Sequence, residues 1–247
     1  MTDNSQLMYV LVVGGTGATG RWLVDQLTQR GCAVTAVVRH TATIPHQLTN
    51  NDRVTLVEAD LLELTDEALD ELVAHADAIV SCLGHNISFK GIYGQPRRLV
   101  TDATRRLCEA IVRQDPEQPK KFVLMNTVGN RNKDLDEQES MRTKIVKGLL
   151  RLLLPPHPDN EQAADYLRTA IGQNHGSMEW VAVRPSGLID SETVTDYSEH
   201  PSPTRDPIFD DGQISRINVA HFMARLITDE NTWSMWKGQM PVLYLAE

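Results

Sequence analysis

The sequence predicts an α/β fold in which helices cover both faces of a doubly wound parallel sheet. A continuous apolar run at residues 9–13 leads directly into a glycine-rich turn and then into an amphipathic stretch, which is typical of a strand, a tight turn and a helix. Short apolar runs and amphipathic stretches then alternate through most of the chain. The length of 247 residues suits one domain with a sizeable core.

The glycine-rich turn has the spacing of a dinucleotide-binding loop, with Gly14, Gly17 and Gly20 between a strand and a helix. Gly14 can adopt backbone angles that other residues avoid, Gly17 leaves room for a diphosphate, and Gly20 lets the helix approach the strand. Amides at the start of the helix would face the anion. An ordinary glycine turn is the alternative. We therefore expect a Rossmann-type sheet. The candidate cofactor-binding residues here are Gly14, Thr16, Gly17, Ala18, Thr19, Gly20 and Arg21.

The residue after the second predicted strand, at residues 33–38, indicates which dinucleotide binds. In such folds an acidic residue about 20 positions beyond the glycines contacts the ribose 2′-hydroxyl of NAD, whereas an arginine suits the 2′-phosphate of NADP. This sequence has Arg39 there, with no acidic residue beside it. A guanidinium matches a phosphate in geometry and charge, and Arg21 could add a second cation. NADP is favoured over NAD, and a solvated strand-end arginine is the alternative.

Strands and helices continue to alternate up to residue 125. Further strands are predicted at residues 54–58, 78–80 and 121–125, and helices at residues 20–30, 65–74 and 97–113. Gly84 follows the fourth strand and would let the backbone approach a cofactor closely, although a plain turn glycine is nearly as good an interpretation. Ligands bind at the carboxyl ends of strands in open α/β sheets, so the loops that follow the strands are the candidate site.

The second half of the chain adds two insertions to this pattern. Residues 130–139 are charged and lack apolar periodicity, so we expect a surface excursion that could act as a lid. Residues 193–212 form a long insertion suited to binding or to disorder. We predict helices at residues 140–154, 159–171 and 218–228, with Asp159 or Asn160 capping the second, and strands at residues 179–184 and 241–245. The chain is thus predicted to be one domain, residues 1–247, with substrate-side insertions at about 130–158 and 190–215.

Composition limits the classes of partner. A formal net charge of -9 disfavours nonspecific binding to nucleic acid or to an anionic membrane. The three cysteines are far apart and lack metal-ligand spacing, so we expect them to be buried and reduced, with no metal site. No signal segment opens the sequence, and the longest apolar stretch, residues 145–154, is short and interrupted by charges. We expect a cytoplasmic protein.

Taken together, these motifs resemble the NmrA-like, NAD(P)H-binding branch of the atypical short-chain dehydrogenases/reductases. The resemblance covers residues 8 to 230 and rests on the order and spacing of five motifs, which are the segment 14–20, Arg39, Asp60-Leu61, Gly84 and the segment 183–187. It implies that Asp60 and Leu61 border the adenine and that Pro185 and Gly187 lie near the nicotinamide. Asp60 could instead cap the turn that follows it.

The catalytic residues of that family transfer less well to this chain. Its reductases often carry a tyrosine and a lysine four residues apart, and that pair is missing here. Placed on the family pattern, His157 takes the tyrosine position and Glu161 the lysine position, so His157 is a candidate proton donor that Glu161 could orient. Thr127 and Tyr93 are further candidates, as a hydrogen-bond donor and as a cover for the nicotinamide. The alternatives are a loop histidine, a threonine that caps its own turn and a tyrosine that only packs.

Two functions remain open from the sequence. The first is an oxidoreductase that transfers hydride between NADPH and a small carbonyl, quinone or flavin-like acceptor. The second is a nonenzymatic NADP(H)-binding module that reports redox state to a protein partner. The family resemblance favours the oxidoreductase, and the missing tyrosine and lysine favour the sensor. The partner is accordingly a small-molecule substrate or a protein, and the sequence does not predict the oligomeric state.

Overall fold

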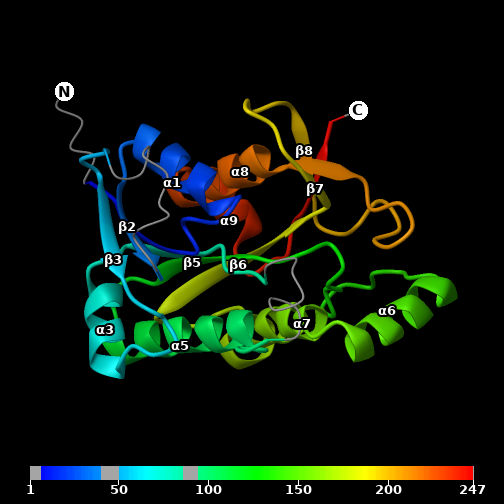
Figure 1. The fold of residues 1–247 in the computed structure, drawn as a ribbon, viewed down its shortest axis with the longest axis horizontal. Helices are drawn as coiled ribbons and strands as arrows, with labels where there is room; N and C mark the ends of the chain where they lie inside the picture. Colours follow the sequence, from blue (N-terminus) through cyan, green and yellow to red (C-terminus); the bar gives the residue numbers. More distant parts are fainter. Residues whose placement is uncertain (1–6, 40–49, 86–93, 247) are drawn as a thin grey trace.

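The computed structural model describes residues 7–39, 50–85 and 94–246, and an eight-stranded sheet lies at its centre (Figure 1). The strand order is β3-β2-β1-β4-β5-β6-β10-β8, and every neighbouring pair is parallel except β8 with β10. The strands are β1 (Tyr9–Val13), β2 (Ala33–Val38), β3 (Val54–Glu58), β4 (Ala78–Ser81), β5 (Lys120–Met125), β6 (Met178–Pro185), β8 (Tyr197–His200) and β10 (Val242–Leu245). The chain reverses its direction of travel between β1 and β4, so the predicted doubly wound, Rossmann-type topology is confirmed.

Helices cover both faces of this sheet. In Figure 1, α1, α8 and α9 lie above it, α3, α5 and α7 lie below it, and α6 extends away from the lower layer. The helices are α1 (Gly20–Gln29), α3 (Asp66–Ala74), α5 (Leu99–Gln114), α6 (Met141–Leu153), α7 (Pro156–Tyr166), the π-helical segment η2 (Leu167–Ile171), α8 (Arg216–Thr228) and α9 (Glu230–Trp236). A second, parallel pair of strands is formed by β7 (Gly187–Ile189) and β9 (Gln213–Ser215).

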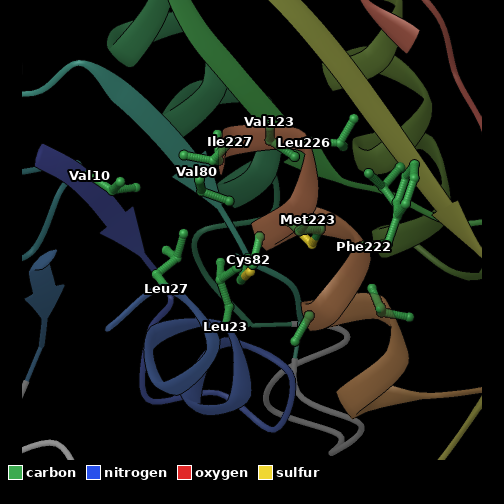
Figure 2. Close-up of a cluster of buried hydrophobic side chains, with 14 of the residues drawn as sticks. Val10, Leu23, Leu27, Val80, Cys82, Val123, Phe222, Met223, Leu226 and Ile227 are labelled. Atoms are coloured by element: carbon green, nitrogen blue, oxygen red, sulfur yellow. The ribbon is translucent and has the colours of Figure 1, made fainter. Parts of the chain in front are cut away.

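Alternate residues of each central strand face opposite layers, which explains why the strands are apolar throughout. In β1, Val10 and Val12 join the core under α1 and α8, whereas Leu11 and Val13 join the core formed with α3, α5 and α7. Figure 2 shows the upper core, where Leu23 of α1 lies near Met223 of α8. The apolar residues Phe222, Met223, Leu226 and Ile227 of α8 are fully buried, and the three free cysteines are buried as predicted.

The helix beginning near residue 159 was predicted too late. The helix α7 begins at Pro156, which suits a first helical position because proline has no amide to leave unpaired. Asp159 therefore lies inside α7 and does not cap it. Its buried carboxylate instead accepts hydrogen bonds from the amides of Val100 and Thr101, each at 2.9 Å, at the start of α5. Asp159 thus supplies a cap to a different helix.

Both insertions contribute more to the interior than the sequence indicates. The segment 193–212 supplies the edge strand β8, so it is in part ordered sheet. The segment 130–139 was predicted to be a surface excursion, and this is wrong for Asn130, Asn132 and Glu137, which are buried. Glu137 is held there by the side chain of Arg184 from β6, because a buried charge requires a partner. In the ranges that the structure describes, no helix combines the length and apolar character needed to cross a bilayer.

Candidate functional site

A cavity of about 260 Å³ lies at the carboxyl ends of β1, β2, β3 and β4. Because parallel strands end at one edge of a sheet, residues that are far apart in the sequence meet there. The residues predicted to bind a cofactor that line this cavity are Gly14, Thr16, Gly17, Arg39, Asp60, Leu61 and Gly84. Apolar neighbours that the sequence did not single out complete the lining, among them Leu83 and Leu99.

The glycine-rich turn has the backbone that the sequence predicts. Gly14 has a φ of 78°, and a Cβ there would lie 2.7 Å from the carbonyl carbon of Cys82. A Cβ on Gly20 would lie 2.1 Å from the carbonyl oxygen of Gly14, so only glycine lets α1 begin this close to β1. Gly17 differs, because its Cβ would meet only the Gly14 carbonyl oxygen, at 3.2 Å. The space beside Gly17 is therefore open, as a bound diphosphate requires.

Arg39 and Asp60 line the same cavity but differ in their hydrogen bonding. Arg39 is exposed and makes no hydrogen bond or ion pair with any other residue that the structure describes, so its guanidinium is available. Asp60 accepts a hydrogen bond from the amide of Leu62 at 2.9 Å, which confirms the alternative in which it caps the following turn. Asp60 thus borders the cavity while one carboxylate oxygen holds the turn.

The remaining residues of the glycine-rich segment lie around the turn and do not line this cavity. Thr19 is buried at the N-cap position of α1, and Gly20 is the first residue of that helix. The guanidinium of Arg21 lies over the ring of Trp22, with its carbon 5.7 Å from the ring centre. Their contact with a cofactor, like that of Ala18, stays a prediction.

A second cavity, of about 440 Å³, lies at the carboxyl ends of β5 and β6, next to the first along the same sheet edge. It brings together four residues that the sequence analysis proposed separately, namely Thr127, His157, Pro185 and Gly187. Further lining residues that sequence reasoning missed are Leu150, Ile208, Asp211 and Arg216. Two of these, Ile208 and Asp211, belong to the long insertion. The position of that insertion on the ligand side of the sheet is the sequence feature that could have identified them. Tyr93 lies outside the described residues.

His157 faces this cavity from α7, but the predicted help from Glu161 is weak. The imidazole is 12% exposed, its Nε2 lies 3.5 Å from Oε1 of Glu161, and that nitrogen has no hydrogen-bond partner among the described residues. Both Glu161 oxygens instead accept hydrogen bonds from Arg151, at 2.8 Å each. Burial lowers the pKa of His157 below its usual 6.5, and Glu161 opposes this shift only in part. A neutral imidazole is therefore favoured at neutral pH.

A buried polar network holds the start of α7 against the sheet. The Asn126 side chain donates a hydrogen bond to the carbonyl of Asn160 at 2.9 Å and accepts one from the amide of Thr127, also at 2.9 Å. Asp159, which is 1% exposed, lies 2.7 Å from Nε2 of His85 as well as capping α5. These contacts tie the helix that carries His157 to β5 and α5, and they set the position of the imidazole.

Thr127 takes part in its own turn, as one interpretation of the sequence expects. Its hydroxyl oxygen accepts a hydrogen bond from the amide of Gly129 at 3.3 Å. The hydroxyl hydrogen remains available to a ligand in the second cavity. Among the residues that the structure describes, no group of three histidine, cysteine or acidic side chains has the geometry to hold a metal ion.

Comparison with known proteins assigns a family to this architecture. A family model described as NAD(P)H-binding matches residues 14–230. The mitochondrial 40 kDa subunit of NADH-ubiquinone oxidoreductase from Neurospora crassa is 26% identical over an alignment of 114 residues, which covers 43% of this chain and 28% of that protein. An uncharacterized chloroplastic protein from Arabidopsis thaliana is 30% identical over 119 residues, 48% of this chain and 41% of that protein. The chain spans less than half the length of these curated relatives.

Solved structures extend the likeness of fold to nearly the whole chain. A Bacillus halodurans protein, described as a candidate NAD-dependent epimerase/dehydratase, has a TM-score of 0.71 and 22% identity, covering 97% of this chain and 95% of that chain. A short-chain dehydrogenase/reductase from Veillonella parvula, in complex with NADP, has a TM-score of 0.67 and 16% identity, covering 96% and 94%. With the family match spanning the glycine-rich turn, both cavities and α8, the chain belongs to the family of NAD(P)H-binding proteins.

Proposed function

We propose that this protein is an NADP(H)-dependent oxidoreductase of the NmrA-like branch of atypical short-chain dehydrogenases/reductases. The observation that carries the proposal is the placement of two cavities along one sheet edge. The first collects the glycine-rich turn and Arg39, and the second collects Thr127 and His157. A dinucleotide is long enough to have its diphosphate at the turn and its nicotinamide near Pro185 and Gly187.

The preference for NADP over NAD rests on Arg39. Its guanidinium follows β2, lines the first cavity and has no acidic partner among the described residues. A guanidinium can bind a 2′-phosphate through two hydrogen bonds. The carboxylate in the same cavity, Asp60, comes from the neighbouring strand and already accepts the amide of Leu62. The 2′-phosphate of NADP would therefore bind more strongly beside Arg39 than the ribose 2′-hydroxyl of NAD would.

Bound NADPH would supply the hydride, and the residues of the second cavity would orient the acceptor. The Thr127 hydroxyl can donate a hydrogen bond to an acceptor oxygen, because its own turn uses only the oxygen as an acceptor. His157 can hold a proton beside the same space, but its lowered pKa reduces the protonated fraction at neutral pH. The residues present thus suit a small carbonyl, a quinone or a flavin-like acceptor, of which the last two depend least on a proton from His157.

One observation favours the second candidate function, a nonenzymatic sensor of NADP(H) that acts through a protein partner. The lysine of the usual tyrosine–lysine pair is replaced by Glu161, and Arg151 occupies both oxygens of that carboxylate. The cationic residue that lines the second cavity, Arg216, is itself paired with Asp190 at 3.0 Å. Neither arrangement offers His157 the strong charge coupling that a positioned general acid often has.

Calorimetric titration with NADPH and NADH tests the proposal. The protein should bind NADPH more tightly, and Arg39→Ala should remove about 1.5–3 kcal/mol of that preference while leaving NADH affinity nearly unchanged. Arg105→Ala is the matched control, because Arg105 is a half-exposed arginine on α5 outside both cavities. Equal affinities for the two dinucleotides would contradict the NADP assignment. Turnover with a panel of carbonyls, quinones and flavins then separates the enzyme from the sensor.

A further inference from the structure

A third cavity, of about 260 Å³, adjoins the one that contains Thr127 and His157, because Val128 and Pro207 line both. Its walls come from the two insertions, residues 131–147 and 203–207, and they are rich in charged side chains. None of the residues proposed above to bind the cofactor or to act in catalysis lines this cavity. The residues of the third cavity therefore have no role in the function proposed above.

The acidic residues that line the third cavity are already engaged by the protein. Glu137 uses both oxygens to bind Arg184, at 2.7 and 3.1 Å. Glu139 forms an ion pair with the buried Lys147. Asp206 accepts the hydroxyl of Thr143 at 2.5 Å and the amides of Ile208 and Phe209 at 3.0 and 3.1 Å. Cations therefore compensate the charges of Glu137 and Glu139, and hydroxyl and amide donors stabilise that of Asp206.

Arg131 is the cation of this cavity that lacks such a partner. Its Nε is buried and has no hydrogen-bond acceptor, and no carboxylate among the described residues pairs with its guanidinium. An unpaired buried donor on a permanent cation is costly, so a ligand acceptor at this position would be strongly favoured. Lys147, which is 2% exposed, lines the same wall but is already paired with Glu139. A carboxylate or phosphate of a ligand would supply the partner that this guanidinium lacks among the described residues.

We propose that this cavity binds an anionic group, a carboxylate or a phosphate, of the molecule whose reacting part lies between Thr127 and His157. The inference rests on the proposed function, and it narrows the acceptor to a compound that carries an acidic group one cavity away from its reducible centre. A planar guanidinium can hold either anion through paired hydrogen bonds. The location of Arg131 in the insertion gives that segment a role in specificity.

The test follows the Nε–H resonance of Arg131 by nuclear magnetic resonance while the intact protein is titrated with succinate or, separately, with inorganic phosphate. Arg131→Gln identifies the resonance by its disappearance, and thermal unfolding confirms that the variant is folded. We expect at least one probe to shift the resonance in the wild type and, in a calorimetric titration, to bind about tenfold or more weakly to Arg131→Gln. Arg105→Gln, the same change on the surface of α5, should bind within about twofold of the wild type.

The two probes separate the sources of the anion, since binding of succinate alone indicates a carboxylate and binding of phosphate alone a phosphate. Phosphate could also bind at the glycine-rich turn, so Arg39→Gln is included. Phosphate binding that is lost in Arg39→Gln and retained in Arg131→Gln, with no effect of succinate, overturns the inference. An unshifted Arg131 resonance with both probes does so as well. NADPH titration of the same samples distinguishes the two failures. Normal NADPH binding without anion binding rejects only this inference. Anion binding at Arg131 without NADPH binding rejects only the proposed function.

Discussion

Glu137 and Arg184 form a doubly hydrogen-bonded ion pair in the interior, with Oε1 2.7 Å from Nη2 and Oε2 3.1 Å from Nη1. Arg184 is fully buried in β6, and its remaining donors bind the carbonyl oxygens of Asn130, Pro201 and Met240. This one guanidinium therefore joins both insertions and the approach to β10 to the central sheet. Among the described residues, Glu137 is the carboxylate that compensates the charge of Arg184, so the position of both insertions depends on this ion pair.

Glu137→Gln should lower the free energy of unfolding by about 3–5 kcal/mol, because it leaves the buried Arg184 without its counter-charge. Denaturant unfolding at neutral pH measures the change. Asp190→Asn is the matched control, since it breaks the pair between Asp190 and Arg216, in which the Asp190 side chain is 80% exposed, and it should cost less than about 1 kcal/mol. Similar losses of unfolding free energy in both variants would show that the buried pair stabilises the protein no more than the exposed one.

Two glycines of the same turn should respond in opposite ways to valine. Gly20→Val should prevent normal folding, because even a Cβ would lie 2.1 Å from the Gly14 carbonyl oxygen. Gly17→Val should fold, because its nearest contact is 3.2 Å away, and should lose NADPH binding, because the branched side chain enters the proposed diphosphate site. Thermal unfolding and calorimetry of each variant check this. A folded Gly17→Val with unchanged NADPH affinity would place the phosphates elsewhere.

Local signals account for the part of the structure that the sequence predicted. The strand β2 was predicted with its observed bounds because a β-branched run between two turns is typical of a buried strand. Thr65 and Ser140 cap α3 and α6 through their hydroxyls, which explains why those helix starts agree. Arg39 and Gly84 could be assigned to the site because Arg39 directly follows β2 and Gly84 lies in the loop after β4, at the carboxyl ends of two parallel strands.

Contacts between distant segments account for what the sequence could not predict. Asp159 has the composition of a local helix cap, but its carboxylate binds amides 58 and 59 positions away. Glu137 lies in a charged, aperiodic segment, and only its partner 47 positions later makes its burial favourable. The same limit applies to the site, since nothing local to Glu161 indicates that Arg151 occupies its carboxylate.

Burial of His157 predicts a pH dependence of stability. Its pKa is lowered in the folded state, so the folded protein binds this proton less tightly than the unfolded chain does. The free energy of unfolding should therefore be highest above about pH 6.5 and fall as the pH drops through the lowered pKa. His221 is also lowered by burial and should act in the same direction.

Chemical denaturation at pH 7.5 and at pH 5.5 measures this dependence. His157→Gln should reduce the difference in unfolding free energy between the two pH values, because it removes one of the groups that take up a proton on unfolding. His75→Gln, at an exposed histidine, is the control and should leave the difference unchanged. A His157→Gln variant with the full wild-type dependence would mean that this imidazole titrates as it does in the unfolded chain.

The same lowered pKa predicts how His157 acts on an acceptor. If its imidazolium donates the proton to a carbonyl, NADPH oxidation should decline as the pH rises through the lowered pKa, and His157→Ala should remove this limb with a loss of about 10²–10⁴-fold. Quinone or flavin reduction should change far less, because hydride transfer to those acceptors does not depend on that proton. NADPH affinity should change little, since the phosphates are proposed to lie in the first cavity, which His157 does not line. Carbonyl turnover that survives in His157→Ala would reject the acid role. The sensor would be favoured if NADPH bound tightly, no acceptor were turned over, and a partner protein were recovered only when NADPH is present.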